Sequence, residues 1–207
     1  MMDETMDAAE DEAPEGITVL AGLAEAGLPE RVARADWLFF HAGMYSNFAR
    51  DPDMVEALET ALDRPEFTRL DIVSFDPAAG AEYWDEFRLI LRRDMPEVTL
   101  RREFAASSNF CDALARRHPT TVRLFRTRAL PLAPILLVGD MIYAGHYLHG
   151  PLPAPMGLWL AIPADVGDLL ERAEDDASPE VLDPVAKGAY RLVCECVAAR
   201  NASRRLV

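Results

Sequence analysis

The sequence predicts a mixed α/β domain, with a mostly parallel sheet and helices on both faces. Half of the 207 residues are apolar and 27% are charged, which is typical of a globular chain. Short apolar runs alternate with amphipathic segments of helical length, and such alternation favours parallel strands joined by crossover helices. Later, two apolar runs meet at Gly139-Asp140, which indicates an antiparallel hairpin.

The predicted strands are apolar or alternating runs that end near a glycine, a proline or a polar turn. They cover residues 36–43, 68–76, 97–105, 120–128, 134–139, 141–147 and 157–162. The predicted helices follow capping residues or carry apolar side chains at helical spacing. They cover residues 17–35, 52–64, 80–93, 107–117, 165–173 and 184–197. Asp51-Pro52 and Asp183-Pro184 are clear helix starts, because Asp caps and Pro suits the first helical position.

The charge of the chain is unevenly distributed. Its 35 acidic and 21 basic side chains give a formal charge of −14. Residues 1–16 hold seven acids and no base, so we expect a disordered acidic leader ahead of a single domain over residues 17–207. The acidic balance makes bulk nucleic-acid binding an unlikely function. Residues 88–128 carry ten Arg and four acids, which predicts either a solvated basic face or an anion-binding patch.

Cofactors, metals and membrane segments are not expected. The stretch 141–164 has no Asp, Glu, Lys or Arg, but its prolines and glycines exclude a continuous spanning helix. Three cysteines without a paired framework, Cys111, Cys194 and Cys196, favour a reducing, cytoplasmic location. There is no Walker loop or dinucleotide fingerprint, and the pair His146 and His149 has no third metal ligand nearby in the sequence.

The segment 41–53, HAGMYSNFARDPD, is the most suggestive loop. It follows the first predicted strand, where α/β folds place ligand sites, and it precedes a capped helix. Ser46, Asn47 and Arg50 suit a phosphate or carboxylate there, and a plain connecting loop is the alternative. The Pro-rich segment 150–157 is interpreted as a stiff connector. The alternative is that it covers a pocket or forms a dimer contact, with Met156 and Trp159 supplying apolar surface.

Residues 120–162 resemble the phospholipase D-like superfamily, as a single copy. In that family a strand carries His-x-Lys-x-x-x-x-Asp, a hairpin follows, and the next strand carries a Gly-Ser-x-Asn-like sequence. Asp140 falls at the motif Asp, but the His and Lys positions read Ala133 and Ile135. The Gly-Ser-x-Asn positions read Gly145-His146-Tyr147-Leu148. The resemblance implies a phospholipase D-like fold, and the missing His and Lys imply that attack on a phosphodiester is lost.

The leading interpretation is a non-catalytic phospholipase D-like domain that binds an anionic small molecule or a nucleotide, or serves as a regulatory module. The predicted ligand pocket consists of His41, Ser46, Asn47, Arg50, Arg126, Asp140 and His146. One alternative is a phosphodiesterase or nuclease with a rearranged site built on His41 or His146. Another is a structural homodimer, because pairing of two such domains is usual in the resembled family.

Overall fold

The computed structural model describes residues 16–76, 78, 81–91, 95–131, 133–147 and 152–205. The predicted leader, residues 1–16, therefore lies outside the described residues except for Gly16. The strands are β1 (Thr18–Leu20), β2 (Trp37–His41), β3 (Arg69–Phe75), β4 (Val122–Thr127), β5 (Ile135–Val138), β6 (Met141–Gly145), β7 (Trp159–Pro163) and β8 (Arg204–Arg205). The α-helices are α1 (Leu28–Arg34), α2 (Ser46–Arg50), α3 (Pro52–Asp63), α4 (Ala81–Leu91), α5 (Glu97–Arg117), α6 (Val166–Glu174) and α7 (Pro184–Asn201). Three short 3-10 helices complete the fold, η1 (Leu23–Ala26), η2 (Ala154–Met156) and η3 (Pro179–Val181).

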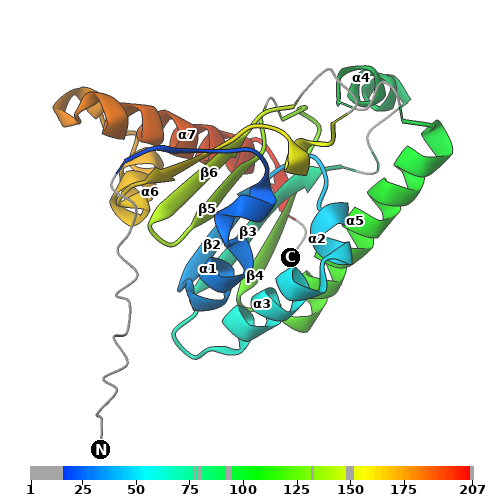
Figure 1. Ribbon diagram of the computed structural model, residues 1–207, viewed down its shortest axis with the longest axis horizontal. Coiled ribbons are helices and arrows are strands. Elements are labelled where there is room, and N and C mark those ends of the chain that lie inside the picture. Colours follow the sequence, from blue (N-terminus) through cyan, green and yellow to red (C-terminus); the bar gives the residue numbers. More distant parts are fainter. Residues whose placement is uncertain are drawn as a thin grey trace, which may run out of the picture.

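All eight strands form one sheet in the order β1-β7-β6-β5-β2-β3-β4-β8. Figure 1 shows helices on both sides of this sheet, with α1, α3 and α5 on one side and α6 and α7 on the other. The predicted mixed α/β class with helices on both faces is confirmed. The prediction of a mostly parallel sheet is wrong, because only the pairs β2–β3 and β3–β4 are parallel and the other five are antiparallel.

The antiparallel half of the sheet arises from short connections. β5 turns directly into β6 at Gly139, whose φ of 58° is favourable for glycine. β5 then lies beside β2, antiparallel to it, and β6, β7 and β1 extend the sheet outward. Among strands that are neighbours in the sheet, α-helices connect β2 to β3 and β3 to β4, and these two pairs are the parallel ones.

Residues 97–105 were expected to form a strand, and this prediction is wrong. They are the first half of α5, a single helix of 21 residues. Its buried residues recur every three or four positions along one face, at Leu100, Phe104, Ser107, Cys111 and Leu114. Ser107 therefore lies inside the helix and does not cap it. The alternating pattern of residues 97–105 is short, whereas the helical period continues through Arg117.

The two edge strands were not predicted. Residues 17–35 were expected to be one helix, but they begin with β1 and continue as η1 and α1. Gly22 (φ 133°) and Gly27 (φ 55°) separate these elements, because both hold backbone conformations that other residues rarely adopt. At the opposite edge, β8 pairs antiparallel with β4.

The core has a layer on each face of the sheet. In β2, Leu38 and Phe40 pack on the side of α1 and α3, whereas Phe39 packs on the side of α6 and α7. Side chains alternate along a strand, so His41 follows Phe39 onto the α7 side. None of the described helices combines the length and the apolar character that crossing a membrane requires.

Candidate functional site

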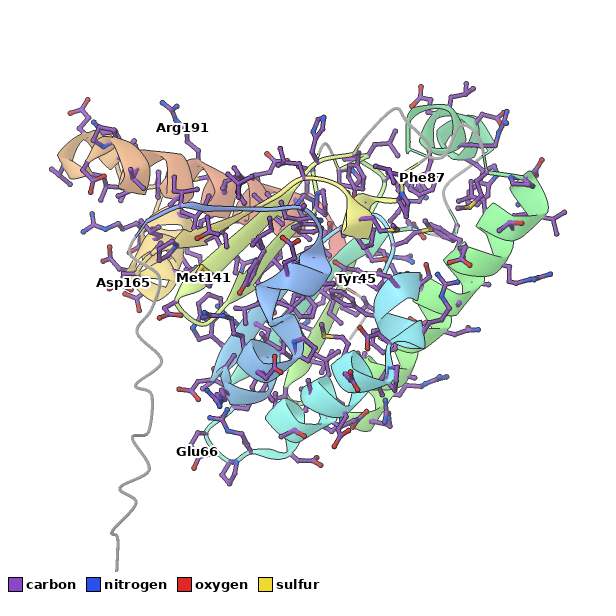
Figure 2. All side chains as sticks on the ribbon, in the orientation of Figure 1. Tyr45, Glu66, Phe87, Met141, Asp165 and Arg191 are labelled. Atoms are coloured by element: carbon purple, nitrogen blue, oxygen red, sulfur yellow. The ribbon has the colours of Figure 1, made fainter. Side chains whose placement is uncertain are left out.

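A cavity of about 120 Å³ lies at the carboxyl end of β2. One wall is the segment Ala42–Phe48 with Arg50, which covers the loop after β2 and most of α2. A second part of the lining consists of Pro153, of Ala154 and Pro155 in η2, and of Trp159 at the start of β7. Phe87 of α4 and Glu103 of α5 contribute from a third side. Figure 2 labels two of the lining residues, Tyr45 and Phe87.

Hydrogen bonds to neighbouring elements fix the start of α2. The backbone N–H of Tyr45 donates to the hydroxyl of Ser107 in α5 at 2.8 Å. The Tyr45 hydroxyl, fully buried, donates to the carbonyl of Val73 in β3 at 2.7 Å. At the other end of α2, the Arg50 guanidinium pairs with the carboxylate of Glu103, and this hydrogen bond raises the pKa of Arg50. The helix that carries Ser46 and Asn47 is thus attached to both α5 and β3.

The rings of Pro134 and Trp159 lie close to the backbone of Gly145 in β6. A Cβ atom at this position would lie 2.8 Å from both the Pro134 ring and the Trp159 indole. Glycine therefore lets these two cavity-lining rings pack against the backbone of β6. The Trp159 indole N–H donates to the carbonyl of Ala154 at 2.8 Å, which ties β7 to η2.

The cavity combines apolar walls with a small polar region on α2. Ser46 is 6% exposed, and Asn47 follows it. Across the described residues, neither the Ser46 hydroxyl nor the Asn47 side-chain amide has a hydrogen-bond partner. Arg50, in contrast, is paired with Glu103. The polar part of the lining thus includes the Ser46 hydroxyl, the Asn47 amide and the Arg50–Glu103 ion pair.

Three of the seven predicted pocket residues, Ser46, Asn47 and Arg50, line this cavity. Asp140 does not, because it lies in the β5–β6 turn at the other end of β2, in a shallow depression with Trp37 and Asp165. In Figure 2, Asp165 and Met141, which follows Asp140, lie far from Tyr45 and Phe87. The hairpin turn accounts for the Gly139-Asp140 sequence.

Arg126 is also outside the cavity lining. It is buried in β4, and its guanidinium donates to the hydroxyls of Ser74 and Ser108 and to the carboxylate of Asp112. These bonds join β3, β4 and α5. Other arginines of the Arg-rich stretch also pair with acids, namely Arg101, Arg117, Arg123 and Arg128. Much of the positive charge of residues 88–128 is therefore compensated within the protein.

The two histidines of the predicted pocket occupy different environments. His41 is 3% exposed on the α7 side of the sheet, beside Val73 and Ile135, and its Nδ1 has no hydrogen-bond partner within the described part of the chain. Burial lowers the pKa of His41 from 6.5 to about 4, so the ring is neutral at pH 7. His146 is exposed, and His149 lies outside the described residues. No group of three His, Cys, Asp or Glu side chains suited to a metal ion occurs in the described ranges.

Ala133 and Ile135, which the predicted resemblance puts at the motif His and Lys, lie at or just before the start of β5. Ile135 is fully buried in β5, where it pairs with His41 of β2. Ala133 lies just before that strand and is half-buried. Neither residue carries a nucleophilic or cationic group near the cavity.

Several cavity residues were missed in the sequence. The Pro-rich segment, interpreted as a connector, supplies Pro153, Ala154 and Pro155 to one wall. Glu103 lies in the predicted strand 97–105 and Phe87 in the predicted helix 80–93, and neither was predicted to line a site. The available signal was the alternative interpretation of the Pro-rich segment as a pocket cover with Trp159 as apolar surface, and Trp159 lines the cavity.

Comparison with known proteins gives no family. A scan against protein families finds no match, and a search of curated proteins finds none either. Among solved structures, the archaeal chromatin protein TrmBL2, described with a novel mode of DNA binding, matches with a TM-score of 0.42 and 12% identity over 81% of this chain and 53% of its own. Phosphatidylserine synthase of Haemophilus influenzae matches with a TM-score of 0.43 and 13% identity over 94% of this chain and 47% of its own.

This chain thus spans about half the length of either protein. Likeness at this level assigns neither a family nor an activity. The phospholipase D-like resemblance, the homodimer and the cytoplasmic location stay predictions.

Proposed function

We propose that this chain is a non-catalytic binding module that encloses one small organic molecule at the carboxyl end of β2. The observation that carries the proposal is the cavity of about 120 Å³, with apolar walls beside Ser46 and Asn47, whose side chains have no hydrogen-bond partner among the described residues. Ligand sites typically combine such walls with a few well-placed polar groups.

The volume of the cavity limits the size of its ligand. An engineered apolar cavity of roughly 150 Å³ takes up benzene or xenon. At about 120 Å³, this cavity suits one six-membered ring or a short branched chain. A nucleotide is several times larger, so only part of it would be enclosed. The size therefore favours a small organic molecule over the nucleotide that the sequence suggested.

The positions of the titratable groups favour binding without catalysis. Ala133 and Ile135 stand where the resembled family has its reacting His and Lys. The buried His41 does not line the cavity, and its low pKa keeps it neutral. The charged lining residues Arg50 and Glu103 form an ion pair with each other. None of the described lining residues is an activated nucleophile.

Filling the cavity tests the proposal. Ala154 is 6% exposed in the cavity wall, so Ala154→Leu should occupy space that a ligand needs. Ala198→Leu on the exposed side of α7 makes the same chemical change away from the cavity. Benzene at 100 times its dissociation constant should stabilise the wild type and Ala198→Leu by about 2.7 kcal/mol. Ala154→Leu should show no stabilisation.

The measurement is thermal unfolding with and without benzene, and circular dichroism establishes that each variant is folded. Equal stabilisation of Ala154→Leu and the wild type would place binding elsewhere and refute the proposed site. Absence of any effect of benzene on the wild type would refute an apolar binding cavity.

A further inference from the structure

We infer, building on the proposed function, that the cavity selects an uncharged ring compound with one hydrogen-bonding group. An aromatic amide or alcohol belongs to this class, whereas the carboxylate or phosphate of the same ring does not. The inference reverses the anionic ligand that the sequence suggested. It rests on the charge balance of the lining, on two polar side chains without a partner among the described residues, and on the aromatic walls.

The charge balance disfavours an anion. Arg50 is the basic residue among the described lining residues, and Glu103 is the acidic one. The two side chains form an ion pair, so Arg50 offers a ligand no uncompensated positive charge. The Arg50 side chain is also 59% exposed, and water screens its field. A carboxylate entering the cavity would lose its hydration without meeting an uncompensated positive charge.

Ser46 and Asn47 suit a neutral polar group. A hydroxyl both donates and accepts a hydrogen bond, and an amide side chain does the same through separate atoms. Both residues line the cavity from α2, and within the described residues both side chains lack a partner. An amide or alcohol on the ligand can exchange donors and acceptors with them, whereas a carboxylate only accepts.

The walls favour a planar ring. Phe48, Phe87 and Trp159 line the cavity together with proline rings. Phe87 is held in place by stacking on Phe75, with ring centroids 5.3 Å apart. Aromatic side chains attract other rings through offset-stacked and edge-to-face contacts, beyond the gain from burying area. A flat ring therefore gains more from these walls than a flexible chain of equal volume.

Benzamide and benzoate form the decisive pair, because they have nearly the same shape and differ in charge at pH 7.5. Isothermal titration calorimetry should show benzamide binding to the wild type at least about tenfold more tightly than benzoate, the worth of one good hydrogen bond. Glu103→Gln leaves the charge of Arg50 uncompensated, so it should narrow this preference by raising the affinity for benzoate.

Polar contacts are tested by Ser46→Ala and Asn47→Ala. At least one of them should lower the ratio of benzamide affinity to benzene affinity measurably, by up to about tenfold. Asn109→Ala, on the exposed side of α5, is the matched control and should keep the wild-type ratio.

Two outcomes overturn the inference while leaving the proposed function intact. The first is benzoate binding as tightly as benzamide to the wild type. The second is a benzamide-to-benzene ratio that neither Ser46→Ala nor Asn47→Ala changes. If benzene, benzamide and benzoate all fail to bind, the proposed function fails as well, and the inference fails with it.

Discussion

His41 should make the stability of this protein depend on pH between 4 and 6.5. The pKa of its side chain is about 6.5 in an unfolded chain and about 4 in the folded protein, because burial disfavours the charged ring. In this interval the unfolded state binds a proton that the folded state does not. The contribution to stability is therefore complete above pH 6.5 and is lost as the pH falls towards 4.

The size of the effect follows from these two values. Between pH 7.5 and pH 4.5, protonation of the unfolded state at His41 should cost about 2.5 kcal/mol of stability. Carboxylates titrate in the same range, so the wild type must be compared with a variant that lacks only this imidazole. His41→Leu is suitable, because the neighbours Val73 and Ile135 are apolar and the Nδ1 atom has no partner to lose.

Urea unfolding followed by circular dichroism measures the effect at both pH values. The wild type should lose about 2.5 kcal/mol more than His41→Leu on going from pH 7.5 to pH 4.5. His146→Leu is the control, since His146 is exposed, and it should behave as the wild type does. Identical losses in the wild type and His41→Leu would refute the reasoning, because His41 would then titrate alike in both states.

Three further substitutions test the packing and charge described above by urea unfolding at pH 7.5. Asp71→Asn should destabilise by about 3 kcal/mol, because the fully buried carboxylate holds the partly buried guanidinium groups of Arg123 and Arg200; a loss below 1 kcal/mol, as expected for an exposed pair, would contradict this. Gly145→Ala should lower the free energy of unfolding by about 2 kcal/mol and weaken benzene binding, since the added methyl overlaps Trp159. If stability and benzene affinity were both unchanged, the Trp159 ring would have moved aside without cost. Asp183→Ala should cost about 1 kcal/mol, because its carboxylate caps α7 through two backbone N–H groups, and an unaltered unfolding midpoint would count against that cap.

Local signals predicted most of the elements of this fold. Asp51 and Asp183 accept hydrogen bonds from the first turns of α3 and α7, as the Asp-Pro pairs indicate. The hairpin at Gly139 also formed where its residues predict it. The sequence did not predict that most strand pairs are antiparallel, because this depends on which edge of β2 the β5–β6 hairpin pairs with. That choice is made by packing between segments about 100 residues apart, which leaves no pattern within a short window.

The candidate site likewise combines residues that local sequence predicted with residues that only the fold brings together. Segment 41–53 was identified because it is continuous in the sequence and follows a buried strand. Phe87, Glu103 and Trp159 reach the cavity only through the fold. Glu103 is also the partner of Arg50, 53 residues away, and this pairing changes the expected ligand from an anion to a neutral molecule. The local sequence around Arg50 contains no sign of that compensation.

Intermolecular nuclear Overhauser effects between benzamide and the protein would locate the ligand directly. We expect contacts to the side chains of Leu136, Phe87 and Trp159, which line the cavity from different elements. Contacts to Trp37 at the opposite end of β2, or no specific contacts at saturating benzamide, would contradict a binding cavity at the carboxyl end of that strand.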